Sequence, residues 1–188
     1  MTDPATIAVL LLAAGQSERF GSDKLLAVLD GVPVALHAAN RLAELGAGWK
    51  IAVCREGSPL AGELAALGFD IVTNPDPARG LSSSLALGIG RAETLGAKAA
   101  MIALGDMPFV SRGHFDALLA VFDPATRPIV ASDREGVAMP PALFARSFFV
   151  DLRAEEGDHG ARALIRGATL VAADPDELVD IDRPEDIR

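Results

Sequence analysis

The sequence has little cysteine and few aromatic residues. Its single cysteine, Cys54, ends the apolar stretch 51–54, so one chain can build neither an internal disulfide framework nor a thiolate metal site. Aromatic residues make up only 5% of the chain. We therefore expect Cys54 to be a small buried hydrophobic residue and expect the protein to be cytoplasmic.

Long apolar segments and positive charge are also scarce. No apolar run approaches the roughly 18 residues of a membrane span, and the longest, residues 7–14, has the length of a strand. The N-terminal segment has no basic region and contains Asp3, so no signal peptide is expected. A formal net charge of −9 disfavours nucleic acid and anionic membranes as partners, since both favour basic surfaces. A local group of Arg and Lys can still bind a small polyanion.

The chain does contain a repeated alternation of short apolar runs and helical patterns. Strands are expected at residues 7–13, 49–53, 69–73, 99–104, 128–132 and 168–173. Helices are expected at residues 34–45, 59–67, 82–95, 111–121, 141–147 and 159–165, with serines capping the third. This order predicts one α/β domain over residues 1–188, with a mainly parallel sheet and helices on both faces in three layers.

Ligands of open α/β sheets bind at the carboxyl ends of the strands. The first such segment, residues 14–24, contains Gly15, Gly21, Arg19 and Lys24. Glycines let backbone N–H groups approach phosphate oxygens, and Arg and Lys together suit a triphosphate. The segment has neither the Walker A nor the G-x-G-x-x-G spacing. From its residues alone, an ordinary turn with two solvated cations explains it equally well.

Two further segments follow strands. Residues 74–84 end in three serines at a predicted helix start, where hydroxyl and N–H groups can donate to an anion or a base edge. Simple capping is the alternative. Asp106 follows an apolar strand in a Gly-Asp-x-Pro turn and offers hard oxygen ligands to Mg²⁺. An Asx turn is the alternative for Asp106.

The last third of the chain has two acidic segments. Asp158 and Arg162 are four residues apart, so they form either a helical ion pair or part of a site in which Arg162 meets a phosphate. Asp180 and Asp182 alternate on a strand-like stretch and would share one face. The alternative is that this stretch only leads into a short helix beginning at Pro184.

Taken in order, these segments resemble a known family. The pattern L-A-A-G-x3-R-F-G-x2-K spans residues 12–24, and NP (74–75), GLSSSL (80–85), LGDMP (104–108), GDHGAR (157–162) and DIDRPED (180–186) follow. Together they resemble the signature of the molybdenum cofactor nucleotidyltransferases. The L-A-A-G form is similar to that of the cytidylyl branch, whereas the guanylyl branch usually has L-A-G-G, so Ala14 suggests CTP.

The resemblance implies roles for individual residues. Arg19, Lys24 and Asp106 would be catalytic, with Asp106 as the Mg²⁺ ligand. The nucleotide would be bound by Leu12, Ala13, Ala14, Gly15, Arg19, Lys24, Asn74, Gly80, Ser82, Ser83, Ser84 and Asp106. The acceptor would meet Asp158, Arg162, Asp180 and Asp182. Many relatives have a basic residue and a Gly-His/Asn-Pro turn where this chain has residues 133–144, so the acceptor side departs from the pattern.

The implied reaction is attack by a phosphate of molybdopterin on the α-phosphorus of CTP, with release of pyrophosphate. A molybdenum hydroxylase apo-enzyme would be a further partner. Two alternatives stay open: a related transferase that uses GTP or a sugar phosphate, and a non-catalytic carrier that hands the finished cofactor to an apo-enzyme. No His/Cys cluster indicates zinc.

Overall fold

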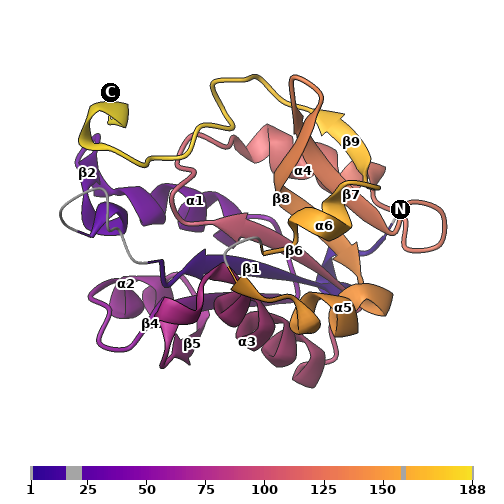
Figure 1. Cartoon of the computed structure of the whole chain (residues 1–188), viewed down its shortest axis with the longest axis horizontal. Helices are drawn as coiled ribbons and strands as arrows, with labels where there is room; N and C mark the ends of the chain where they lie inside the picture. Colours follow the sequence, from indigo (N-terminus) through magenta and orange to yellow (C-terminus); the bar gives the residue numbers. More distant parts are fainter. Residues whose placement is uncertain (1, 16–22, 158–159, 188) are drawn as a thin grey trace.

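A seven-stranded sheet forms the centre of the protein, seen in the computed structural model that describes residues 2–15, 23–157 and 160–187 (Figure 1). Its strand order is β5-β4-β1-β6-β8-β7-β9, and only β8 runs against its neighbours. The strands are β1 (Ile7–Ala13), β4 (Trp49–Arg55), β5 (Asp70–Asn74), β6 (Ala99–Leu104), β7 (Ile129–Arg134), β8 (Val137–Ala145) and β9 (Thr169–Ala172). A separate hairpin pairs β2 (Val28–Leu29) with β3 (Val32–Pro33).

Helices cover both faces of this sheet. One face packs against α1 (Val34–Ala43), α2 (Leu60–Ala66) and α4 (Arg112–Val121). The other packs against α3 (Leu81–Thr94), α5 (Phe149–Ala154) and α6 (Arg162–Ile165). The predicted three-layer, mainly parallel α/β fold is confirmed. Short 3-10 turns lie at η1 (Pro4–Thr6), η2 (Lys24–Leu26), η3 (Pro77–Arg79), η4 (Arg146–Phe148) and η6 (Pro184–Asp186).

Strand β1 shows why its sequence is apolar at every position. Val9 and Leu11 pack into the core beneath α1, whereas Leu10 and Leu12 pack into the core beneath α3. A strand that is buried on both faces needs a continuous apolar run rather than alternation. Gly88 lets α3 approach this strand closely, because a Cβ there would lie 2.3 Å from the Leu10 side chain.

Cys54 is buried as expected, and burial raises the pKa of its thiol to about 11. The thiol therefore stays protonated and unreactive at neutral pH. Among the described residues, no helix combines the length and apolar composition needed to cross a bilayer.

The predicted helix at residues 141–147 is wrong, because residues 141–145 belong to strand β8. Its residues pair with β6 on one side and β7 on the other, and Leu143 and Phe144 face opposite cores. Hydrogen bonding to two neighbouring strands overrides the helical spacing of the sequence. The following turn and helix α5 also replace the expected end of that helix.

Three smaller expectations need correction. Gly80, not a serine, is the N-cap residue of α3, and the side chain of Ser83 donates back to its carbonyl at 2.8 Å. The helix expected at residues 159–165 begins at Arg162. Residues 180–182 lie outside any strand, yet the two aspartates are exposed around buried Ile181, so the expected alternation is present. Pro184 does begin a short 3-10 turn.

Candidate active site

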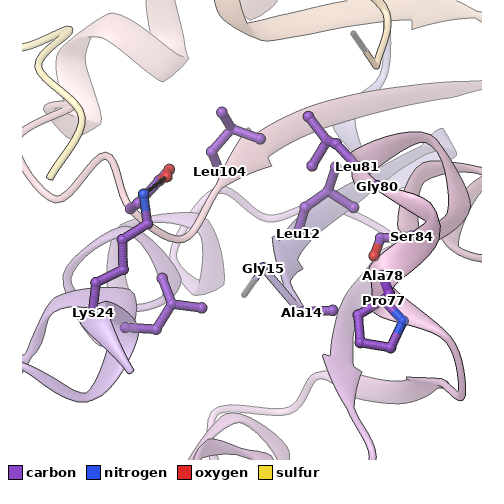
Figure 2. Close-up of a pocket in the computed structure, with 12 residues that line it drawn as sticks. Leu12, Ala14, Gly15, Lys24, Pro77, Ala78, Gly80, Leu81, Ser84 and Leu104 are labelled. Carbon is purple, nitrogen blue, oxygen red and sulfur yellow. Dashed lines mark ion pairs between the residues drawn. The ribbon is translucent and has the colours of Figure 1, made fainter. Parts of the chain in front are cut away.

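A cavity of about 350 Å³ lies at the carboxyl ends of β1 and β6 (Figure 2). Seven residues of the predicted nucleotide site line it: Leu12, Ala14, Gly15, Lys24, Gly80, Ser84 and Asp106. Leu25, Pro77, Ala78, Leu81 and Leu104 complete the lining. Figure 2 shows Lys24 on one side of the cavity and Pro77, Ala78 and Ser84 on the other. The structure therefore brings together segments that are far apart in the sequence.

Glycine shapes the backbone on two sides of this cavity. Gly80 has φ +89° at the N-cap position of α3, a conformation that a residue with a Cβ adopts only under strain. Gly105 donates its N–H to the Leu12 carbonyl at 2.9 Å, and a Cβ there would lie 3.2 Å from the same oxygen. The turn that carries Asp106 is thus held against the end of β1.

Asn74 fixes the serines rather than entering this cavity. Its side-chain amide donates to the hydroxyls of Ser83 and Ser84, both at 2.9 Å, and its oxygen accepts the N–H of Asp76. Asn74 is buried, and Ser84 is held toward the cavity. Sequence reasoning gave Asn74 a binding role, and the structure gives it a positioning contact.

Three other predicted nucleotide contacts point elsewhere. Ser82 and Ser83, like Asn74, line a separate groove that residues 153–157 also border. The methyl group of Ala13 belongs to the core on the opposite face of the sheet, which leaves only its backbone near the cavity. The Ser82 hydroxyl is buried and has no hydrogen-bond partner among the described residues.

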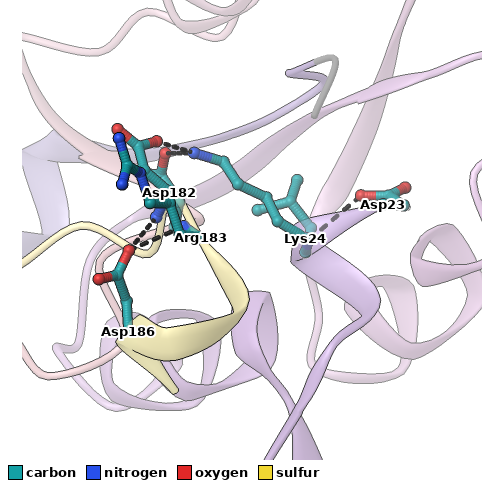
Figure 3. Close-up of polar contacts among 7 residues, drawn as sticks. Asp23, Lys24, Asp182, Arg183 and Asp186 are labelled. Atoms are coloured by element: carbon teal, nitrogen blue, oxygen red, sulfur yellow. Dashed lines mark hydrogen bonds and ion pairs between the residues drawn. The ribbon is translucent and has the colours of Figure 1, made fainter. Parts of the chain in front are cut away.

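Lys24 joins two carboxylates at the edge of the cavity. Its Nζ lies 2.8 Å from Asp106 Oδ2 and 2.7 Å from Asp182 Oδ1 (Figure 3). The Lys24 and Asp106 side chains are 14% and 20% exposed, whereas the Asp182 side chain is 50% exposed. The pair with Asp106 is therefore the less screened of the two.

Burial and charge act against each other in this group. Burial raises the pKa of Asp106, the positive charge of Lys24 opposes that rise, and the nearby charge of Asp180 adds to it. Burial alone would lower the pKa of Lys24, but the attraction of Asp106 and Asp182 raises it above its ordinary value. Lys24 is thus firmly protonated, and the ionised form of Asp106 is disfavoured.

The surrounding backbone fixes these groups. Asp23 caps η2 by accepting the N–H of Leu25 and also pairs with Arg55 at 2.8 Å, which anchors the segment beneath Lys24. The Ile181 N–H donates to the Asp106 carbonyl at 2.8 Å and ties the C-terminal segment to the central turn. Arg41 donates to the Pro108 carbonyl in the same turn. These positioning contacts join partners far apart in the sequence.

Asp106 has the features of a ligand for a divalent cation. Its Oδ1 atom is buried without a hydrogen-bond partner among the described residues, although buried carboxylate oxygens are normally paired. No group of three His, Cys, Asp or Glu side chains in that part of the chain forms a complete metal site. Mg²⁺ is commonly held by one or two carboxylates together with substrate phosphates, so the residues present fit such an ion.

A second cavity, of about 620 Å³, lies beside the first and shares Leu104 with it. It contains Arg162 and Asp180 of the predicted acceptor site, together with Arg166. Its remaining walls are mostly apolar and come from Met107, Gly136, Val137, Ala138, Met139, Pro140 and Leu170. Strand β8 and the turn before it thus supply most of this wall, where the family resemblance implied a polar turn.

Comparison with known proteins decides the family. A sequence model of the MobA-like NTP transferase domain matches residues 9–175. The chain belongs to this family. It is 30% identical over 200 residues to the purine catabolism protein PucB of Bacillus subtilis, with 99% of this chain and 96% of PucB covered. It is 27% identical to a probable molybdenum cofactor guanylyltransferase of Thermococcus kodakarensis, over 83% of this chain and 76% of the relative.

Solved structures share the MobA-like fold. Rv0371c of Mycobacterium tuberculosis superposes with a TM-score of 0.80 at 24% identity, covering 96% of this chain and 95% of that one. A second structure of Rv0371c, in complex with manganese, gives a TM-score of 0.68 at 21% identity, covering 96% and 92%. The protein is a nucleotidyltransferase of the MobA-like type.

Two predicted residues of this MobA-like site, Arg19 and Asp158, lie outside the described residues. Arg166, which lines the second cavity, was not among the site residues predicted from the sequence. It follows Arg162 by four positions, so both lie on one side of α6 and its C-terminal end. Two arginines at this spacing in an acidic protein could have indicated an anion-binding role for Arg166 from the sequence.

Proposed function

We propose that this nucleotidyltransferase transfers CMP from CTP to a molybdopterin-type molybdenum cofactor and releases pyrophosphate. The observation that supports it most is the cavity in which Lys24, Asp106 and Ser84 surround the L-A-A-G turn. A cation for a triphosphate, a carboxylate for a metal and a hydroxyl donor for a base thus lie within one cavity of ligand size.

Ala14 is the basis for preferring CTP. The residue is 2% exposed and lines the cavity directly after β1. Its methyl group narrows the space in which a base lies, and a smaller pyrimidine tolerates this better than a purine. Ser84, held by Asn74, offers a hydroxyl in the same cavity.

The reaction forms one P–O bond and breaks another. An acceptor phosphate oxygen attacks the α-phosphorus of CTP, the bond between the α-phosphorus and its bridging oxygen breaks, and pyrophosphate leaves. A phosphate nucleophile is already ionised near neutral pH, so the enzyme mainly positions the reactants and offsets charge. Lys24, with Arg19, would bind the β- and γ-phosphates.

Asp106 would hold the divalent cation through its unpaired Oδ1. When bound, that cation supplies Lewis-acid polarisation of the α-phosphate. The solved Rv0371c complex with manganese supports a divalent ion in this fold, and we propose Mg²⁺ for this chain. On the acceptor side, Arg162 and Arg166 would bind phosphate, with Asp180 beside them.

GTP is the second candidate nucleotide, because a relative that matches 83% of this chain is named a molybdenum cofactor guanylyltransferase. Pyrophosphate release should be measured with CTP, GTP, ATP and UTP, with the acceptor and either Mg²⁺ or Mn²⁺. We expect CTP to give the highest kcat/KM. Faster release from GTP would reverse the nucleotide assignment, and no release from any nucleotide would favour a non-catalytic carrier.

A further inference from the structure

The ammonium group of Lys24 lies where the metal and its ligands are expected. It contacts Asp106 Oδ2 and Asp182 Oδ1 at 2.8 and 2.7 Å, and Asp180 adds a third negative charge close to Asp106. Without a cation these carboxylates would repel one another at a partly buried site. Lys24 is therefore their counterion in the ligand-free protein.

One ammonium group cannot serve two sites at once. At these distances from both carboxylates, Lys24 is committed to them and is not available to a triphosphate. A divalent cation at Asp106 would also meet a positive charge within a few ångströms, which weakens its binding. The ligand-free arrangement thus disfavours both the metal alone and the nucleotide alone.

We propose that Lys24 is an exchangeable counterion that couples metal binding to nucleotide binding. In the ligand-free protein it neutralises Asp106 and Asp182. When metal and triphosphate bind together, Lys24 leaves the carboxylates and pairs with the phosphates. This inference rests on the proposed function of the site, and it adds a positive coupling between its two ligands.

The local structure allows the side chain alone to make this exchange. The backbone around Lys24 is fixed, because Asp23 caps η2 and pairs with Arg55, and the neighbouring Leu25 is buried. Lys24 itself has a flexible four-carbon stem that reorients without moving the chain. It also lines the cavity proposed for the triphosphate, so the distance to travel is short.

Asp182, the second partner of Lys24, lies in a C-terminal turn, residues 182–186, whose backbone is held by Asp186. Asp186 Oδ2 accepts the N–H groups of Asp182 and Arg183 at 3.0 and 2.7 Å (Figure 3). Asp182 therefore remains near the site after Lys24 leaves. Its half-exposed side chain makes that ion pair the weaker of the two and easier to break.

Coupling of this kind is reciprocal and has a testable sign. Removing the charge of Lys24 should strengthen metal binding in the absence of nucleotide, because the competing cation is gone. The same change should weaken metal binding in the presence of CTP, because the triphosphate is no longer held. A residue that only binds phosphate would leave the nucleotide-free metal affinity unchanged.

The test is an Mn²⁺ titration of the full chain, followed by electron paramagnetic resonance, without nucleotide and with CTP. We expect Lys24→Met to bind Mn²⁺ about 5- to 10-fold more tightly than wild type without nucleotide, a coupling of ordinary size. Lys24→Arg keeps the charge and should stay near wild type. Lys98→Met, an equal charge change at an exposed residue just before β6, is the matched control. Unchanged or weaker nucleotide-free binding by Lys24→Met would overturn the inference.

A second measurement uses the wild-type chain and so does not depend on whether Lys24→Met folds. Acylation of individual lysines is followed by mass spectrometry with and without saturating Mn²⁺. Lys24 should react faster with Mn²⁺, since it leaves its carboxylates, while Lys98 should not change. An unchanged Lys24 rate would contradict the exchange. Both nucleotide-free readouts are independent of turnover, so failure to release pyrophosphate would count against the proposed function alone.

Discussion

The two cavities that meet at Leu104 are built in different ways. The first cavity, proposed as the nucleotide side, is made of strand ends and a helix start, with buried Ala14 and Ser84 and a glycine at φ +89°. The second, proposed as the acceptor side, is made largely of apolar residues of β8 together with Arg162 and Arg166, which form no ion pair with any described residue. Backbone and short side chains are preorganised, whereas long arginines are positioned only by their ligand.

This difference suggests how specificity is divided. We expect the short buried groups of the first cavity to discriminate one base from another by shape, since they relax little around the wrong ligand. The other side can bind an anion but orders its arginines only when the ligand arrives. Substitutions at Gly80 and Ala14 should therefore change nucleotide affinity through geometry, and those at Arg162 and Arg166 should change acceptor affinity through charge.

The largest loss of activity is expected for a substitution of Asp106, close to the point where the two cavities meet. Asp106→Asn removes the charge proposed to hold the metal and should lower kcat by roughly 100- to 1000-fold, as for other single groups that stabilise transition-state charge. Turnover by pyrophosphate release and melting by circular dichroism, both at pH 7, check this prediction.

The melting temperature should stay level or rise. Because burial raises the folded-state pKa of Asp106, the stability from this shift exists below the unfolded pKa and is lost as pH rises through the folded pKa. At pH 7 the buried charge of Asp106 lowers stability, whereas its attraction for Lys24 raises stability, so the two effects lost with asparagine should largely offset each other while Lys24 keeps Asp182. Near-normal turnover with a lower melting temperature would mean that Asp106 has only a structural role.

Backbone geometry on the nucleotide side can be tested with two glycines of one helix. Gly80→Ala forces a Cβ into φ +89° and ψ +178° at the start of α3, a region almost confined to glycine, and should cost about 1–3 kcal/mol of stability. It should also raise the KM for CTP about tenfold, because Gly80 lines the cavity. Gly96→Ala, at φ +84° beyond the other end of α3, is the matched control. Gly96→Ala should also lose stability, but its KM for CTP should stay at the wild-type value. Equal KM values for the two variants would show that Gly80 takes no part in binding CTP.

Charge on the acceptor side is tested with Arg166→Gln. Loss of one charge-assisted contact should raise the KM for the acceptor about 5- to 10-fold and leave the KM for CTP unchanged. Steady-state kinetics with each substrate varied in turn would show this split. Arg127→Gln makes the same change in net charge at an exposed residue just before β7 begins, and it should alter neither KM. A parallel rise in both KM values would contradict a division between the cavities.

The smallest effect is expected for Ala14→Gly. Removal of one methyl group from the base-side wall should shift the ratio of CTP to GTP affinity by about threefold toward GTP. Competition binding with both nucleotides measures this ratio. A wild-type chain that favours GTP would show that the methyl group does not select the base.

Much of this site was predictable because its parts are local in sequence. Strands β1 and β6 match the expected residues, since each is a continuous apolar run of strand length. The rule that ligands bind at strand ends then selected the segments that line the first cavity. Contacts between distant parts of the chain could not be predicted from the sequence. Strand β8 depends on two neighbouring strands, and the Lys24–Asp182 pair joins residues 158 positions apart.

The most direct test of the account follows the α-phosphate itself. CTP labelled with ³²P at the α-phosphate is incubated with the full chain, Mg²⁺ and molybdopterin-type acceptor, and the products are separated. The account predicts that the label moves to the acceptor in equal amount to the pyrophosphate released, and that Asp106→Asn nearly abolishes both. Label that stays in CTP, or that appears only in free CMP, would contradict nucleotidyl transfer to this acceptor.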